Sequence, residues 1–541
     1  MSKSKSIILG IDGGDFQYID PLIKDGKLNN INKIISSGVS TVLESTYPPL
    51  TPIAWTTMLS GVTSAKHTIS NWWFLNGKDY SLRPINSSDV KFSRIWDIFN
   101  KQGKTCCVIN VPLTFPPNIE NGILISGFDS PDDIKKMFCP EKSYEEITGL
   151  VGEYKTPPPR IKFKNDYNSY FQDWIDFTFQ QIEILLKVDE KYDFDLLFVV
   201  FSIVDHNNHY FSGTKEEHYE IIKKCYFTVD DVIGKVLDKY PLEENLYYMI
   251  SDHGSMRIEK NVYINKWLAD NGYLVFKNNV LPEKIMKFIS AKLNINYSNF
   301  NYIWNKLPEF VKRIFVSYIR KNYYAGYSFD VIDFEKTRVF VPTIYGEIYI
   351  HSDKLFFKGC VKSDVEYKKL IDELSDKIVK IKDLETGEYI IDKVEINDRS
   401  KKDYPINVPD LICKLKNPEY YYLHAFEFKN TSSYVEKNTQ SNVGGHRKDG
   451  IFVASGYPFK KGYKCKKNYP IVDSTPTMLY AADLKLYKYF EGNIIEEFFN
   501  EKFLSDNKAS IDNEQILLEN KVNENIEYSD IKRKLENLGY L

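Results

Sequence analysis

The stretch Leu246-Tyr-Tyr-Met-Ile-Ser-Asp252-His253-Gly254 contains the pattern that decides the fold. Its apolar first half is typical of a buried β-strand, and it runs directly into a carboxylate and an imidazole. Similar short apolar runs recur along the chain, separated by segments of helical length. These runs are Ser6–Ile11, Thr105–Asn110, Gly122–Ser126, Asp195–Phe201 and Leu246–Ser251. Strands that alternate with helices indicate a doubly wound α/β fold with a mainly parallel sheet.

Acidic residues and histidines follow three of these predicted strands. Asp12 follows the first run, Asp205 and His209 follow the fourth, and Asp252 and His253 follow the fifth. In a doubly wound fold, ligands bind beyond the carboxyl ends of the strands. Asp205 and His209 stand at i and i+4, so on a helix they share one face and can share an ion.

A further histidine, His446, lies in Gly444-Gly-His-Arg-Lys-Asp-Gly450, which we predict to be a tight glycine turn before an apolar strand at Ile451–Ala454. Each of these polar residues alone has a simpler explanation as a helix cap, a surface pair or a turn residue. Together, three aspartates and three histidines, most of them after apolar strands, indicate a metal site. We expect His206 to point away from Asp205. The remaining histidines with weaker claims are His218, His351 and His424.

The segment from Tyr47 to Gly61 reads Tyr-Pro-Pro-Leu-Thr-Pro-Ile-Ala-Trp-Thr-Thr-Met-Leu-Ser-Gly and contains a candidate nucleophile. Thr51 is predicted to be the N-cap of a helix over Ile53–Ser60, with Pro52 at its first position. The positive end of the helix dipole then faces the threonine oxygen. A threonine hydroxyl needs activation to become a nucleophile, and metal coordination supplies it. The alternative is that Thr51 only caps a helix.

The bulk composition excludes several classes of partner. The chain has 541 residues, and its net charge of -3 arises from 71 basic and 74 acidic residues, so no global field favours nucleic acid or acidic membranes. The seven cysteines are odd in number and none has CxxC spacing, which is typical of reduced thiols in a cytoplasmic protein. No stretch has the length that a membrane span requires. We therefore expect a cytoplasmic protein without a membrane span, and the sequence carries no signal for its oligomeric state.

The composition changes along the chain and predicts four parts. The segment after Asn271 is rich in Lys, Asn and aromatic residues, with helical patterns at Glu283–Leu293 and Phe310–Tyr323. The predicted parts are a first part of the core at 1–270, an inserted cap or lid at 271–335, a second part of the core with the last metal ligand at 336–500, and a C-terminal helical tail at 501–541 that ends in a helix at Ser529–Leu538.

The order of these motifs resembles the type I phosphodiesterase/nucleotide pyrophosphatase branch of the alkaline phosphatase superfamily. The likeness is closest to a prokaryotic group of predicted phosphohydrolases or phosphomutases. That branch has a first-strand Asp, a nucleophilic Thr before a helix, Asp-x-x-x-His, Asp-His-Gly and a late Gly-x-His. The corresponding residues here are Asp12, Thr51, Asp205 with His209, Asp252-His253-Gly254 and Gly444-Gly-His446. The resemblance covers most of the chain and is weakest in the predicted cap.

The resemblance implies an alkaline-phosphatase-like core and two divalent metal ions. Asp/His ligation suits zinc, and manganese is possible with the same ligands. The implied ligands are Asp205, His209 and His446 for one ion, and Asp12, Asp252 and His253 for the other, which activates Thr51.

Two further positions follow from the resemblance. Family diesterases use an asparagine after a His-Gly motif to bind phosphate, and Asn71 is the nearest candidate, one position early. His67 matches a motif position that is not a metal ligand, and we interpret it as structural. The sequence departs from the family pattern at Thr68, where Gly is usual, and at Ser255, where Met or Phe is common.

The implied activity is that of a metal-dependent phosphohydrolase acting on a small phosphate ester or pyrophosphate, with no binding of nucleic-acid duplexes. We predict a phosphodiesterase/nucleotide pyrophosphatase with a phosphothreonine intermediate, because no arginine follows Thr51 as in monoester-specific phosphatases. A Thr51-Pro-Ile-Ala run in place of a sulfatase signature excludes a sulfatase. The alternatives are a phosphomonoesterase, a phosphomutase or transferase with the same site, and a non-catalytic binding relative, which predicts a damaged ligand set.

Overall fold

The computed structural model describes residues 4–159, 166–210, 215–277, 332–343, 345–401, 404–422, 433–438, 444–518 and 528–538. The chain forms two compact units. The first contains Met1–Phe74, Leu82–Glu259 and Asn438–Tyr540, and the second contains Leu75–Ser81 and Lys260–Lys437. The helices predicted at Glu283–Leu293 and Phe310–Tyr323 lie outside the described residues.

The first unit is built on a large, mainly parallel sheet with the strand order β20-β2-β19-β9-β1-β8-β5-β6-β7. Its parallel centre consists of β9 Leu246–Ile250, β1 Ser6–Ile11, β8 Leu196–Phe201, β5 Cys106–Val111 and β6 Gly122–Ser126. All five predicted strands are therefore present in this sheet. Their apolar runs are continuous because both faces are covered, which confirms the predicted α/β fold.

Antiparallel strands extend the sheet on both sides. β19 Asp449–Ser455 pairs antiparallel with β9 and with β2 Gly38–Glu44. β7 Phe138–Cys139 pairs antiparallel with β6 at the other edge. The short strands β20 Tyr463–Lys464 and β21 Tyr469–Pro470 pair with β2.

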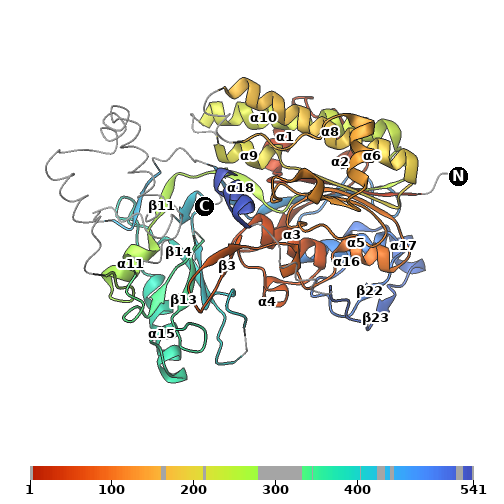
Figure 1. Cartoon of the computed structure of the whole chain (residues 1–541). Helices are drawn as coiled ribbons and strands as arrows, with labels where there is room; N and C mark the ends of the chain where they lie inside the picture. The colour runs from red at the N-terminus through yellow and green to blue at the C-terminus, as the bar shows by residue number, and fades with distance from the viewer. Residues whose placement is uncertain are drawn as a thin grey trace. The chain divides into compact units, whose positions relative to one another are not determined.

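Helices cover both faces of this sheet (Figure 1). On one face lie α1 Phe16–Lys24, α2 Asn29–Ser36, α8 Tyr167–Tyr192 and α10 Lys215–Lys239. On the other face lie α3 Thr51–Ser60, α5 Ile95–Lys101 and α16 Ser474–Ala481. Every residue of α3 is buried, and Trp55 of this helix packs on Phe198 of β8 with ring centroids 6.2 Å apart.

Shorter elements complete the first unit. They are α4 Ser64–His67, β4 Leu82–Pro84, α6 Ser143–Val151, α9 Ile203–Tyr210 and the 3-10 helices Ser87–Asp89, Ile134–Met137, Ile471–Asp473 and Glu496–Phe498. β3 Trp73–Leu75 spans a boundary between the two units. The last part of the chain contains α17 Glu501–Asp506, β23 Ile511–Asp512 paired with β22 Leu486–Tyr487, and α18 Tyr528–Leu538.

A two-stranded sheet carries the last histidine of the predicted metal site. β10 Gly254–Arg257 pairs antiparallel with β18 Gly444–Arg447, so that Ser255 lies opposite His446. The prediction that His446 lies in a glycine turn is therefore wrong. Gly444 instead lets β18 pack closely against the backbone of α9, because a Cβ atom there would lie 2.0 Å from the carbonyl oxygen of Asn208.

The second unit has two small sheets of its own. One has the order β12-β13-β15-β14, and the other has the order β16-β11-β17. The bounds are β11 Lys260–Val262, β12 Val339–Phe340, β13 Glu347–Ile350, β14 Ile391–Ile396, β15 Leu411–Leu415, β16 Tyr420–Tyr422, β17 Val435–Lys437, α11 Ile264–Asp270 and α15 Asp364–Ile378. The division into core, cap at 271–335 and C-terminal tail stays a prediction.

Among the described residues, no helix combines the length and apolarity that a membrane crossing requires. All seven cysteines are described, and each is a free thiol.

Candidate active site

The candidate nucleophile Thr51 is the first residue of α3. Leu50 is the N-cap, because its carbonyl accepts the first helical hydrogen bond from Ala54 N–H at 2.8 Å. The predicted N-cap role of Thr51 is thus one residue off. The Thr51 hydroxyl is fully buried, and its Oγ1 lies 3.3 Å from Nε2 of His253.

The turn after β1 brings Asp12 beside the loop that follows β9. Gly13 adopts a φ of 71°, a left-handed conformation that favours glycine, and its N–H donates to Oδ1 of Asp252 at 3.3 Å. The Ser255 hydroxyl donates to the Gly13 carbonyl at 2.7 Å. These two bonds join the strand ends that carry Asp12 and Asp252.

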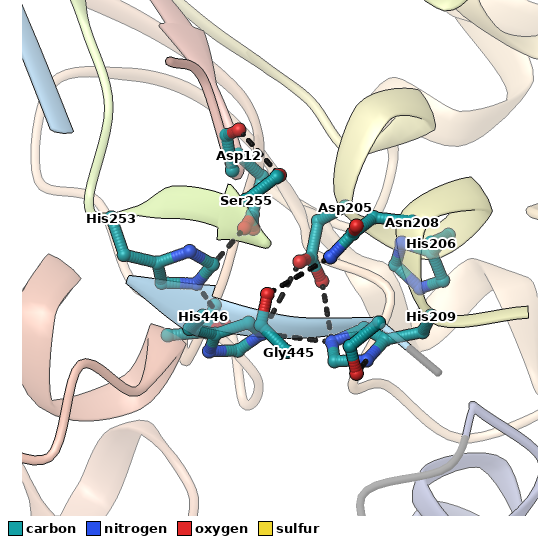
Figure 2. A network of polar contacts seen from close by, with 12 residues as sticks. Asp12, Asp205, His206, Asn208, His209, His253, Ser255, Gly445 and His446 are labelled. Carbon is teal, nitrogen blue, oxygen red and sulfur yellow. Dashed lines mark hydrogen bonds and ion pairs between the residues drawn. The ribbon is translucent and has the colours of Figure 1, made fainter. Parts of the chain in front are cut away.

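Helix α9 supplies Asp205 and His209 on one face, as their spacing predicts. Asp205 Oδ2 lies 3.4 Å from Nε2 of His209, and Oδ1 lies 3.2 Å from Nε2 of His446 (Figure 2). The Nε2 atoms of His209 and His446 are 2.8 Å apart. The side chains of Asp205 and His209 from α9 therefore meet that of His446 from β18, far away in the sequence.

The imidazole of His253 lies between His446 and the carboxylates of Asp12 and Asp252 at the strand ends. Its Nε2 lies 3.1 Å from Asp252 Oδ2 and 3.7 Å from Asp12 Oδ1. Its ring stacks on that of His446 with centroids 3.6 Å apart and an angle of 15° between the planes. The structure thus brings together all the predicted ligands and Thr51 in one buried cluster.

The backbone fixes which nitrogen of each histidine faces the cluster. Nδ1 lies at a backbone carbonyl in all three: at 3.2 Å from Gly444 O for His209, 3.2 Å from Gly254 O for His253, and 2.7 Å from Pro49 O for His446. A carbonyl only accepts, so Nδ1 carries the proton and donates. The Nε2 lone pairs then point into the cluster, as in metal-binding histidines.

This arrangement fits cations and is unfavourable without them. Two sets of side chains have ligand atoms within 4.8 Å of one another: Asp12, Asp252 and His253, and Asp205, His253 and His446. The first set matches the predicted one, and in the second His253 takes the place predicted for His209. Neither carboxylate oxygen of Asp12 has a donor in good hydrogen-bond geometry among the described residues, although Asp12 is fully buried, and the nearby Trp55 indole lowers its pKa only in part. Buried anions of this kind are paired or coordinate metals.

The electrostatics support the same interpretation. Burial and the negative charge of Asp252 raise the pKa of Asp12 well above its usual value. Burial and the neighbouring His253 lower the pKa of His446 to about 4, so that this imidazole stays neutral, as a ligand must.

A comparison with protein families agrees with this geometry. The family model of type I phosphodiesterase/nucleotide pyrophosphatase matches residues 6–446, which includes every residue of the cluster. The chain belongs to this family. Its members are phosphoester hydrolases that depend on metal ions, so the predictions of an enzyme of this type and of a metal site are confirmed at that level. No curated protein sequence matches the chain at a significant level.

Solved structures show that the family's fold is shared. Human ectonucleotide pyrophosphatase/phosphodiesterase 5 is 11% identical with a TM-score of 0.50, and the match covers 92% of this chain and 100% of that one. Phosphonoacetate hydrolase from Sinorhizobium meliloti 1021, in complex with phosphonoformate, is 11% identical with a TM-score of 0.54, and the match covers 89% of this chain and 96% of that one. At this identity the likeness shows the alkaline-phosphatase-like fold alone.

Three other residues singled out in the sequence have different positions. His67 is buried, with Nε2 at 2.9 Å from the Thr57 hydroxyl, and its Nδ1 accepts from Ile69 N–H at 3.1 Å, so it joins α3 to the next loop. His206 points away from the cluster and lies against aromatic rings (Figure 2). Asn71 is buried, and its Oδ1 accepts from Trp72 N–H at 2.7 Å. Its contact with the substrate phosphate stays a prediction.

Three residues support the predicted ligands in a way that the sequence did not predict. Gly13 and Ser255 connect the strand ends, and Asn208 connects α9 to β18. The adjacent pair Gly13-Gly14 after a strand is a signal for a left-handed turn. No signal in the sequence identifies the partner of Asn208, because it comes from a distant strand.

Proposed function

We propose that the chain is a phosphodiesterase or nucleotide pyrophosphatase that works through a phosphothreonine intermediate on Thr51. The observation that carries this proposal is the position of Thr51 Oγ1, which lies 3.3 Å from His253 Nε2 within a buried cluster of carboxylates and imidazoles. A threonine that only began a helix would not need its hydroxyl at such a cluster. The intact ligand set also argues against a non-catalytic binding relative.

The donor set fits two divalent cations, with Asp205, His209 and His446 around one, and Asp12, Asp252 and His253 around the other. Mixed oxygen and nitrogen ligands suit zinc, and manganese accepts the same donors. Bound there, the cations would supply Lewis-acid stabilisation of the attacking and leaving oxygens.

The protein's own groups then bind and orient the substrate. Thr51 Oγ1 attacks phosphorus as the bond to the leaving alkoxide breaks. Water later cleaves the phosphothreonine, which releases a phosphate monoester and regenerates Thr51. Because Thr51 begins α3, the positive end of the helix dipole lies where the phosphoryl group would be held. The hydroxyl proton of Thr51 passes to solvent, from which the leaving alkoxide takes up a proton, and the water that cleaves the phosphothreonine supplies the proton that restores the Thr51 hydroxyl.

The substrate we propose is a small diester or pyrophosphate. The contacts of Arg447, next to His446, argue against a role as a monoester clamp, since it donates to Gln17 Oε1 at 2.8 Å and pairs with Asp449 at 2.5 Å. Asn71 is our candidate for a phosphate contact. We also propose a cytoplasmic location, which is consistent with the seven free thiols.

The test is hydrolysis of bis-p-nitrophenyl phosphate and p-nitrophenyl phosphate by the wild type and by Thr51→Ala. We expect cleavage of the diester and loss of turnover in the variant on the order of 10³-fold or more, with its metal content unchanged. Cleavage of the monoester alone would contradict the proposed substrate class, and full activity of Thr51→Ala would contradict the nucleophile.

A further inference from the structure

A buried asparagine links helix α9 to strand β18 beside the candidate active site. Asn208 lies between the ligands of α9 and is fully buried. Its Nδ2 donates to the carbonyl of Gly445 at 3.1 Å, and its Oδ1 lies 3.1 Å from Nε2 of His218 on α10. One side chain thus contacts Gly445, directly before His446 (Figure 2), and also a histidine on the neighbouring helix.

The chemistry of these groups fixes the direction of the chain of hydrogen bonds. The Gly445 carbonyl only accepts, so the NH2 group of Asn208 must face it. The amide oxygen then faces His218, which must carry its proton on Nε2 and donate it. The order of donation therefore runs from α10 through α9 to β18.

Two other contacts hold the same piece of β18 against α9. A Cβ atom on Gly444 would lie 2.0 Å from the Asn208 carbonyl oxygen, so only glycine permits this approach. His209 Nδ1–H donates to the Gly444 carbonyl at 3.2 Å. The carbonyls of both glycines are thus fixed by α9, and the next residue, His446, is carried to Asp205 at 3.2 Å.

We infer that Asn208 and His218 are positioning residues that hold β18 so that His446 completes the cation site of Asp205 and His209. This inference rests on the proposed function and adds two residues that contact neither substrate nor ion. Groups of this kind orient ligands from outside the coordination sphere, and their loss costs about 10–100-fold in metal affinity or activity.

The chain offers a matched control in Asn207. It is the same residue type, it is buried on the same helix, and its Nδ2 donates to Ile203 O at 2.8 Å within α9 rather than to β18. We expect Asn208→Ala to weaken one of the two bound cations about 10–100-fold and to lower kcat similarly, with KM nearly unchanged. Excess Zn²⁺ should restore kcat. Asn207→Ala should bind both cations as the wild type does.

The histidine allows a rescue experiment further from the ligands. His218→Gln keeps an N–H donor at the position of Nε2 and should bind Zn²⁺ like the wild type, whereas His218→Leu removes the donor and should behave like Asn208→Ala. Competition with a chelating dye measures both dissociation constants, and thermal melting confirms that each variant is folded.

Wild-type affinity for both cations in folded Asn208→Ala or His218→Leu would overturn the positioning role and leave the proposed function intact. Equal losses in Asn207→Ala, or no difference between His218→Gln and His218→Leu, would also overturn it. A wild type without bound cations and without turnover on diester or monoester would instead overturn the proposed function, and the inference with it.

Discussion

Two fully buried aspartates, one in each unit, have opposite surroundings. In the second unit, Asp410 Oδ1 accepts from Arg399 Nε at 2.8 Å and from the Tyr367 hydroxyl at 2.7 Å, while Oδ2 accepts from Ile350 N–H at 2.7 Å. In the first unit, neither carboxylate oxygen of Asp12 has a donor in good hydrogen-bond geometry among the described residues, and the Trp55 indole lowers its pKa only in part. Both side chains are completely inaccessible to solvent.

The difference shows how a structural carboxylate can be told from one prepared for a cation. Burial raises the pKa of both groups, but the Arg399 charge and the hydrogen bonds of Asp410 offset part of the effect. For Asp12 the neighbouring charge is another carboxylate, Asp252, which raises the pKa further. The carboxylate of Asp410 is paired and hydrogen-bonded by protein groups, whereas the buried carboxylate of Asp12 requires a cation from outside the protein.

The largest effect should come from Asp12→Asn. We expect its activity on a diester to fall on the order of 10³-fold, because one cation loses a carboxylate ligand. The free energy of unfolding of the metal-free protein should change little, since the Trp55 indole is only a weak donor to Asp12 and an asparagine oxygen can still accept from it. Steady-state kinetics and urea unfolding in the presence of a chelator measure the two quantities. A large loss of metal-free stability would mean that Asp12 is structural like Asp410.

The converse substitution is Asp410→Asn, which leaves the Arg399 guanidinium, with a side chain 10% exposed, beside a neutral group. We expect a loss of about 3 kcal/mol in the stability of the second unit, because breaking a buried ion pair leaves an uncompensated charge. The metal content of the folded variant should equal that of the wild type. No change in urea unfolding, or loss of cations from a variant that is still folded, would contradict the structural role of Asp410.

Addition of Zn²⁺ to the metal-free wild type should stabilise it by about 2.7 kcal/mol for each of the two proposed sites when free Zn²⁺ is 100 times that site's dissociation constant. Thermal melting of metal-free and Zn²⁺-loaded protein measures this difference. Asp410→Asn should gain the same increment, and Asp12→Asn should gain less. Equal gains in all three proteins would show that Zn²⁺ binds away from Asp12.

The smallest effect is on the pH dependence of stability. The pKa of Asp12 is raised in the folded state, so the folded protein keeps this proton to a higher pH than the unfolded chain does. The metal-free protein should therefore lose stability as the pH rises from the unfolded value toward the raised folded value, by up to about 1.4 kcal/mol per pH unit. Asp12→Asn should lack this component. A wild-type slope no steeper than that of Asp12→Asn, measured by urea unfolding across acidic to neutral pH, would contradict the raised pKa.

The sequence predicted the sheet centre well and the local geometry of the site less well. β1 and β6 begin and end as predicted, because a continuous apolar run buried on both faces leaves little freedom in the boundaries. Thr51 was placed one residue off, since the helix start depends on the Leu50 carbonyl. His446 was expected in a turn, because its glycines permit either a turn or a close approach, and only the packing of Asn208 decides between them.

The number of cations bound per chain tests the proposed two-cation site most directly. Mass spectrometry for metals on purified wild type and on Asp12→Asn, after equilibration with Zn²⁺ and removal of excess, measures it. We expect about two equivalents in the wild type and about one in Asp12→Asn. Equal content in both proteins, or less than one equivalent in the wild type, would contradict it.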